Sequence, residues 1–147
     1  VRIVERMPRR PWTFLYATLM ALLREPPRLL TVRLDGQLWY EGAAYVVAVA
    51  NGTTFGHGMR IAPNAQLNDG LFDVVLVEGV ARARIIAALQ RVFTGTHLTH
   101  PAVRSARAAA VAITSPTGRV DFECDGEYVL TAGAELAIRP GLLSLLR

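Results

Sequence analysis

A carboxylate pair flanks a glycine near the carboxyl end of the chain, at Asp125-Gly126-Glu127. Aspartate and glycine are typical turn residues, so Glu127 could simply open a return strand toward solvent. Alternatively, a tight hairpin could project the Glu127 carboxylate into a cleft as a general base for a hydroxyl nucleophile. The local residues leave both readings open.

A second acidic turn precedes an apolar run, in the segment 67–73. Asp69 before Gly70 could be a turn residue, and Asp73 could be an exposed strand position. Alternatively, Asp69 could bind a hard cation such as Mg²⁺, because that ion prefers oxygen ligands and backbone carbonyls on a tight loop could complete the shell. A single carboxylate is a weak indication of a metal site.

A loop over residues 51–58 carries three glycines within seven residues. Backbone N–H groups in such a loop can approach an anion closely. The loop lacks the Gly-x-Gly-x-x-Gly order and does not open a predicted helix, which excludes the dinucleotide-binding fingerprint. A tight connection between strands is the simpler interpretation.

Composition excludes several kinds of chemistry. All 16 basic residues are arginine, so a Schiff-base lysine and a Walker A phosphate loop are both absent from these residues. Cys124 is the single cysteine and cannot form an internal disulfide, as is usual in a reducing compartment. The three histidines, His57, His97 and His100, make a poor zinc set without further ligands.

The first 29 residues combine basic and aromatic side chains. Four arginines precede or adjoin Trp12, Phe14 and Tyr16, an arrangement that suits an anionic membrane surface or nucleic acid, although a solvated flank is commoner. The apolar run that follows has no cleavage site and is shorter than the roughly 20 residues that span a bilayer. We expect a helix over residues 11–24 that docks on protein or touches a membrane surface.

The remaining chain reads mainly as short strands. Alternating apolar residues predict a hairpin over 30–41 on Asp35-Gly36, a buried strand over 43–50 and another over 71–78. Helical spacing predicts a helix over 81–94, capped by Gly95, and further strands lie around 108–114, 119–124, 128–131 and 135–139. The chain of 147 residues therefore fits one mainly β domain, a two-sheet β-sandwich with about two helices.

The order of these pieces resembles a known family. Residues 46–77, with the glycine loop followed by Leu67-Asn-Asp-Gly70, are similar to the C-terminal domain of the family that includes soluble bacterial diacylglycerol kinases and sphingosine kinases. The likeness continues through 94–103, Asp125-Gly-Glu127 and 138–142, and covers roughly residues 30–147. Residues 1–29 would then lead from an ATP-binding domain, and residues 30–147 would form the β-sandwich.

The resemblance implies roles for particular residues. It assigns Glu127 as the carboxylate that activates a lipid hydroxyl, with Asp125 shaping its hairpin. It assigns Asp69 as the side-chain ligand of a Mg²⁺ ion, with backbone carbonyls at Gln66 and Leu71 completing the protein ligands. The glycine loop would lie near an inter-domain cleft as the cofactor-binding segment, through Asn51, Gly56 and Gly58; His57 stands where the family usually has another glycine.

The resemblance also implies a division of labour. ATP would be held by a Gly-Gly-Asp-Gly-Thr motif in a preceding domain, which these 147 residues lack, so we expect the lipid-facing half of a kinase that is inactive alone. The expected partners are a membrane lipid and the upstream domain, and no nucleic acid is expected. The protein would lie at the cytoplasmic face of the membrane. The sequence leaves open whether it forms a homodimer. The alternatives are a non-catalytic β-sandwich that binds an anionic ligand, a domain related to NAD kinases, or a structural remnant that mediates dimerisation.

Overall fold

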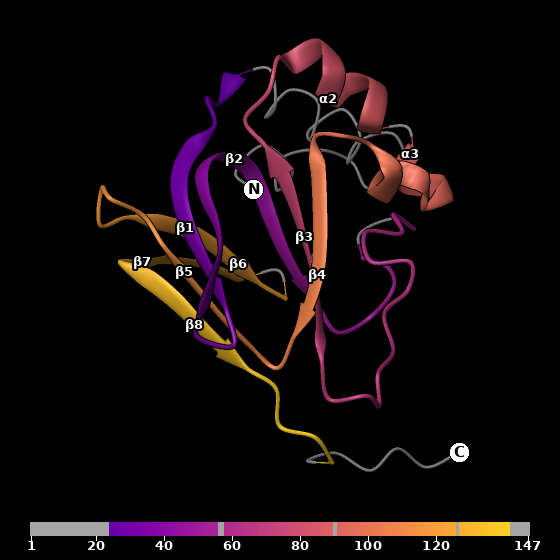
Figure 1. The fold of residues 1–147 in the computed structure, drawn as a ribbon, viewed down its shortest axis with the longest axis vertical. Coiled ribbons are helices and arrows are strands. Elements are labelled where there is room, and N and C mark those ends of the chain that lie inside the picture. The colour runs from indigo at the N-terminus through magenta and orange to yellow at the C-terminus, as the bar shows by residue number, and fades with distance from the viewer. Residues whose placement is uncertain (1–23, 56–57, 90, 126, 142–147) are drawn as a thin grey trace.

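The computed structural model describes residues 24–55, 58–89, 91–125 and 127–141. Apart from residue 24, the predicted helix over 11–24 falls outside this part of the chain, whereas the predicted boundary at residue 29 lies inside the first strand. Antiparallel strands dominate the described residues, with short helical segments between the third and fourth strands (Figure 1). The strands are β1 Arg28–Leu34, β2 Gln37–Ala50, β3 Phe72–Glu78, β4 Val103–Ala108, β5 Ala110–Thr114, β6 Val120–Cys124, β7 Glu127–Thr131 and β8 Gly133–Ala137.

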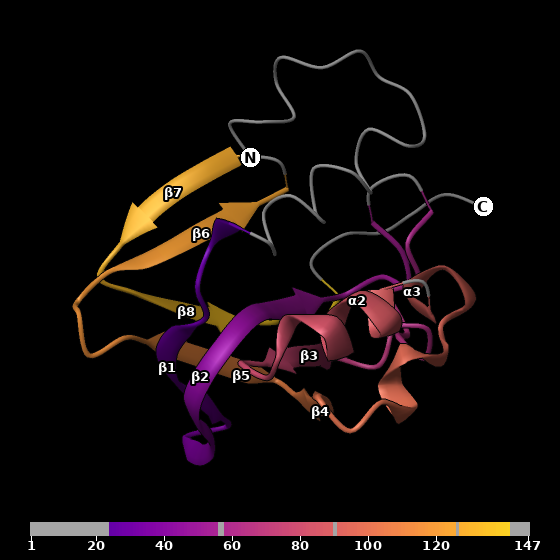
Figure 2. The ribbon, with the colours of Figure 1, turned by 90° about the horizontal axis from the view of Figure 1, so that it is seen from above.

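The strands form two sheets, as the predicted fold class requires. Six strands make one antiparallel sheet in the order β4-β3-β2-β1-β5-β8, and β6 pairs with β7 in a separate two-stranded sheet. The small sheet lies beside β1 and β8, away from the helices, in both views (Figures 1 and 2). The mainly β, two-sheet architecture is therefore confirmed.

The first Asp-Gly hairpin is confirmed by its backbone. Asp35 and Gly36 have φ angles of 49° and 81°, the left-handed values that a type I′ turn needs at both central positions. Contrary to the expectation of a break between residues 41 and 43, β2 continues without interruption to Ala50. A register shift between Ala44 and Val46 lets the strand bend while it stays paired with β3.

Strand β4 is absent from the sequence prediction. Its residues, Val103 to Ala108, include two arginines and a serine and show no apolar alternation. Among the described strands, β4 lies at the edge and pairs with β3 alone, so tertiary pairing decides its conformation where local pattern does not.

The predicted helix over 81–94 is found as α2 Arg82–Leu89 and α3 Arg91–Thr94. Gly95 follows with φ 76°, so the predicted C-terminal glycine is confirmed, and the 3₁₀ helix η2 Thr96–Thr99 begins there. Any side chain at position 95 would also press on Pro63, because an added Cβ would lie 3.0 Å from the Pro63 Cβ. The helical segment is thus fixed against the loop that precedes β3.

Two apolar clusters hold these layers. The larger one joins strands of the big sheet to the small sheet through the buried side chain of Val120 on β6. Its buried members are Val32, Tyr40, Ala44, Val74, Leu76, Ala108, Val111, Ile113 and Val120. The smaller one packs α3 on the loop after the glycine segment, through Met59, Ile61, Ala62 and Val92.

Candidate functional site

The β6–β7 hairpin presents the predicted general base to solvent. Cys124 pairs with Glu127, which leaves a two-residue turn, and Asp125 has φ 49° as in the first Asp-Gly hairpin. Glu127 begins β7 and its side chain is exposed, as is that of Asp125. Gly126 lies outside the described residues. The structure therefore places the Glu127 carboxylate at the tip of a tight hairpin, where an incoming hydroxyl group can reach it.

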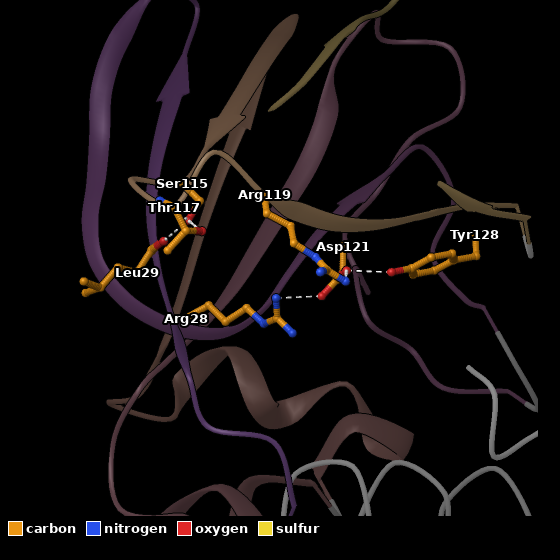
Figure 3. Close-up of polar contacts among 7 residues, drawn as sticks. All are labelled: Arg28, Leu29, Ser115, Thr117, Arg119, Asp121 and Tyr128. Carbon is orange, nitrogen blue, oxygen red and sulfur yellow. Dashed lines mark hydrogen bonds and ion pairs between the residues drawn. The ribbon is translucent and has the colours of Figure 1, made fainter. Parts of the chain in front are cut away.

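The base of this hairpin is tied to the large sheet by a carboxylate that the sequence analysis missed. Asp121 accepts a hydrogen bond of 2.6 Å from the Tyr128 hydroxyl and forms an ion pair of 2.7 Å with Arg28. Figure 3 shows both side chains directed at the Asp121 carboxylate. Arg119 approaches the same carboxylate at 3.7 Å. Arg28 belongs to β1, whereas Asp121 and Tyr128 belong to the small sheet, so the contact joins the two sheets.

The same contacts hold Asp121 ionised. The hydrogen bond from Tyr128 is the main reason that the pKa of Asp121 lies below its ordinary value, and Arg28 and Arg119 lower the pKa further against an opposing contribution of burial. No sequence motif could reveal this network, because Arg28 and Asp121 are far apart along the chain.

The two Asp-Gly turns differ in what the aspartate does. Asp35 Oδ1 accepts hydrogen bonds from the backbone N–H groups of Ala109 and Ala110, at 3.0 and 2.8 Å. These bonds tie the first turn to the connection between β4 and β5. Asp35 therefore has a structural task, whereas Asp125 and Glu127 occupy an exposed turn.

Asp69 lies in the turn before β3, and both of its oxygens have partners. Oδ1 accepts a hydrogen bond of 2.9 Å from the backbone N–H of Leu71, and Oδ2 is paired with the guanidinium of Arg107. Arg107 Nε also lies 3.7 Å from Oδ2 of Asp73, its direct partner across β3 and β4. Burial raises the pKa of Asp73 above its ordinary value.

The neighbouring residues close this turn tightly. Gly70 adopts φ 74°, and an added Cβ there would lie 3.2 Å from Pro140 Cγ. Gln66, the predicted carbonyl ligand on the other side of Asp69, is exposed, and Leu71 is half-buried.

The Asp69 residues as they stand do not fit a Mg²⁺ ion. Oxygen ligands suit that ion. Here, however, the guanidinium of Arg107 is paired with Oδ2 of Asp69, and the N–H of Leu71 donates to Oδ1, so a cation would have to share both oxygens with these groups.

The predicted cofactor loop is a tight connection. The Phe55 N–H donates to the Met59 carbonyl at 3.1 Å, and Gly58 has φ 87°. Asn51 is exposed at the end of β2, and Gly56 lies outside the described residues. An anion at this loop stays a prediction.

A buried histidine fixes the chain just beyond this loop. His97 is 1 % exposed, and its Nε2–H donates to the Ile61 carbonyl at 2.9 Å. Burial lowers the pKa of His97, so the ring stays neutral and serves packing.

The candidate residues do not converge on one place. Asp69 lies next to the β3–β4 edge of the large sheet, whereas the hairpin with Glu127 is attached to β1, beyond β2 in the strand order. Among the residues that the structure describes, no helix has the length and apolar character needed to cross a bilayer.

Comparison with known proteins places the chain in a sequence family. The model of the YegS C-terminal NAD kinase beta sandwich-like domain matches residues 2–147. A diacylglycerol kinase of Mycobacterium tuberculosis is 27% identical over 142 residues, which are 97% of this chain and 45% of that protein. A Pseudomonas putida protein named as YegS-like is 33% identical over 116 residues, 78% of this chain and 37% of that protein. The chain thus spans less than half the length of these relatives.

A solved structure shares the fold. The crystal structure of a diacylglycerol kinase from Bacillus anthracis str. Sterne superposes with a TM-score of 0.60 at 17% identity, over 82% of this chain and 43% of that chain. At this identity the likeness concerns the fold alone.

Proposed function

Since the chain belongs to the family of YegS C-terminal NAD kinase β-sandwich-like domains, we propose that it is the lipid-facing half of an ATP-dependent lipid kinase. Relatives named diacylglycerol kinase support this reaction, and the chain spans 45% of the M. tuberculosis protein. We propose that ATP is held mainly by a preceding domain and that the chain alone transfers no phosphate. Mg²⁺ would arrive with the nucleotide, because both oxygens of Asp69 already contact other groups of the chain.

The observation that carries this proposal is the exposed carboxylate of Glu127 next to the two-residue turn of the β6–β7 hairpin. Phosphoryl transfer depends mainly on positioning and on charge neutralisation. Glu127 would accept the proton of the lipid hydroxyl as that oxygen forms a bond to the γ-phosphorus of ATP. The bond between the γ-phosphorus and the bridging oxygen breaks, and ADP leaves.

The Asp121 network would give this base a fixed position. A two-stranded hairpin alone is marginally stable in water, so it needs contacts with the rest of the fold. Val120 supplies an apolar contact and Asp121 a polar one, from neighbouring residues whose side chains point to opposite faces of β6. Together these two contacts would hold Glu127 in a fixed position relative to the large sheet.

Exposed apolar side chains near the hairpin support a lipid substrate. Leu29 on β1 is 58% exposed, and Tyr128 and Val129 on β7 are 53% and 44% exposed. Leu29 follows Arg28, whose guanidinium contacts the hairpin. Exposed apolar side chains and arginines on the same strands suit the interface of an anionic bilayer, so we propose that the protein touches the cytoplasmic face of the membrane through β1 and the β6–β7 hairpin.

Transfer of labelled phosphate from ATP into a mixed lipid extract tests the proposal. The protein as its gene encodes it should label one lipid class, and Glu127→Gln should lower that rate by about 10²–10⁴-fold. Glu123→Gln is the matched control, because Glu123 is exposed on the same hairpin but four residues earlier, on β6. Equal rates for Glu127→Gln and the wild type would refute the role of Glu127, and absence of any labelled lipid would favour a binding module.

A further inference from the structure

Arg107 lies between two carboxylates that come from different parts of the chain. Its guanidinium pairs with Asp69 of the turn before β3, and its Nε lies 3.7 Å from Asp73 within β3. The Oδ2 atoms of both aspartates are buried and accept no hydrogen bond from the described residues, so their charge is balanced through the ion pairs with Arg107. The side chains of Asp69 and Asp73 are 19% and 12% exposed, whereas that of Arg107 is 41% exposed. The arginine thus reaches from the edge strand into an acidic site that is largely shielded from water.

A guanidinium and a divalent cation would compete for this site. The guanidinium and the cation would both bind the Asp69 oxygen that Arg107 contacts. Because Arg107 is part of the same chain, it stays next to Asp69 whatever the Mg²⁺ concentration. Arginine also keeps its charge at all ordinary pH values, whereas Mg²⁺ must give up tightly held water to bind. The cross-strand pairing of Asp73 with Arg107 fixes the arginine in register with the turn.

We propose that Arg107 is a built-in cation that takes the place of a divalent ion at the Asp69 turn. The turn before β3 is then clamped to β4 by a guanidinium, and its structure does not depend on Mg²⁺. Removal of Arg107 would leave two largely buried carboxylates without the cation that they share. Such a pair lacks a counter-charge and would accept a divalent cation from solution.

Thermal denaturation of the protein as its gene encodes it tests this inference without any measurement of kinase activity. The midpoint of the wild type should be the same in EDTA and in millimolar MgCl₂. Arg107→Met should unfold at a lower temperature in EDTA, and its midpoint should rise with added MgCl₂ until the site saturates. Adding Asp69→Asn to Arg107→Met should abolish that rise.

Arg104→Met is the matched control. Arg104 lies on the same strand and is also paired with a carboxylate, but its partner is Glu78 and its guanidinium stacks over the Tyr40 ring at 5.4 Å. This variant should lose stability without gaining a response to MgCl₂. A response equal to that of Arg107→Met would overturn the inference, because it would show a general effect of lost charge.

Two further results would overturn the inference. One is a wild-type midpoint that rises with MgCl₂ and loses this response in Asp69→Asn, because Mg²⁺ would then bind in the presence of Arg107. The other is a folded Arg107→Met chain without any response. If Arg107→Met does not fold, the wild type and Asp69→Asn still decide, together with Arg107→Lys, which should fold and ignore MgCl₂. None of these results depends on whether the protein phosphorylates a lipid.

Discussion

Replacement of Asp121 by asparagine tests whether the polar contact between the sheets holds the hairpin. Asparagine has nearly the shape of aspartate but no charge, so it keeps a weaker hydrogen bond with Tyr128 and loses the attraction to Arg28 and Arg119. We expect the variant to fold with a less firmly docked β6–β7 hairpin.

The size of the effect follows from the exposure of the partners. A hydrogen bond to a charged group contributes about 1.5–3 kcal/mol before solvent screening, and an exposed ion pair contributes about 0–1 kcal/mol. The Asp121 side chain is 28% exposed and that of Arg28 is 46% exposed, so both contributions are discounted. We expect a loss of about 1–2 kcal/mol in the free energy of unfolding, which lowers the melting temperature by about 3–6 °C at this chain length.

The pH dependence gives a second signature. The folded-state pKa of Asp121 lies below its ordinary value of 3.8. The stabilisation is therefore present above the unfolded-state pKa and is lost as the pH falls through the lower, folded-state value. The difference in stability between the wild type and Asp121→Asn should be constant near neutral pH and should shrink in acid below the ordinary pKa.

Thermal denaturation followed by circular dichroism, from acid to neutral pH, measures both quantities. Asp125→Asn is the matched control, because it removes a carboxylate from the same hairpin and asparagine tolerates the φ of 49° found there. It should melt as the wild type does. Equal melting temperatures for Asp121→Asn and Asp125→Asn at every pH would refute the anchoring role, and a difference that grows in acid would refute the assigned pKa direction.

Substitutions at three other positions test the fold. Asp35→Ala should cost about 1–2 kcal/mol by removing the acceptor of two amides, whereas Asp35→Asn should cost less; equal losses in chemical denaturation would contradict this. Gly70→Ala should lower the melting temperature, because of φ 74° and the contact with Pro140; an unchanged temperature would contradict the strain. Burial lowers the pKa of His97, so stability should fall as the pH drops below 6.5 toward the folded-state value. His97→Gln should remove this slope, and a slope that persists would assign it to another group.

Local pattern predicted the elements that depend on near neighbours. The Asp35-Gly36 and Asp125-Gly126 turns follow from residue types that tolerate positive φ, and their strands from alternating apolar residues. Gly95 marked the end of the helical segment for the same kind of reason. β4 was missed, because an edge strand rich in arginine is specified by its partner and not by its own pattern.

The sequence by itself determined the mainly β class, the tight turns and the placement of Glu127 at a hairpin tip, because these depend on residues close together along the chain. Only the tertiary structure decided what surrounds each carboxylate. It brings Arg28 to Asp121, and Arg107 to Asp69, across long sequence separations. Side-chain partners of this kind are set by strand order and register, which no local motif encodes.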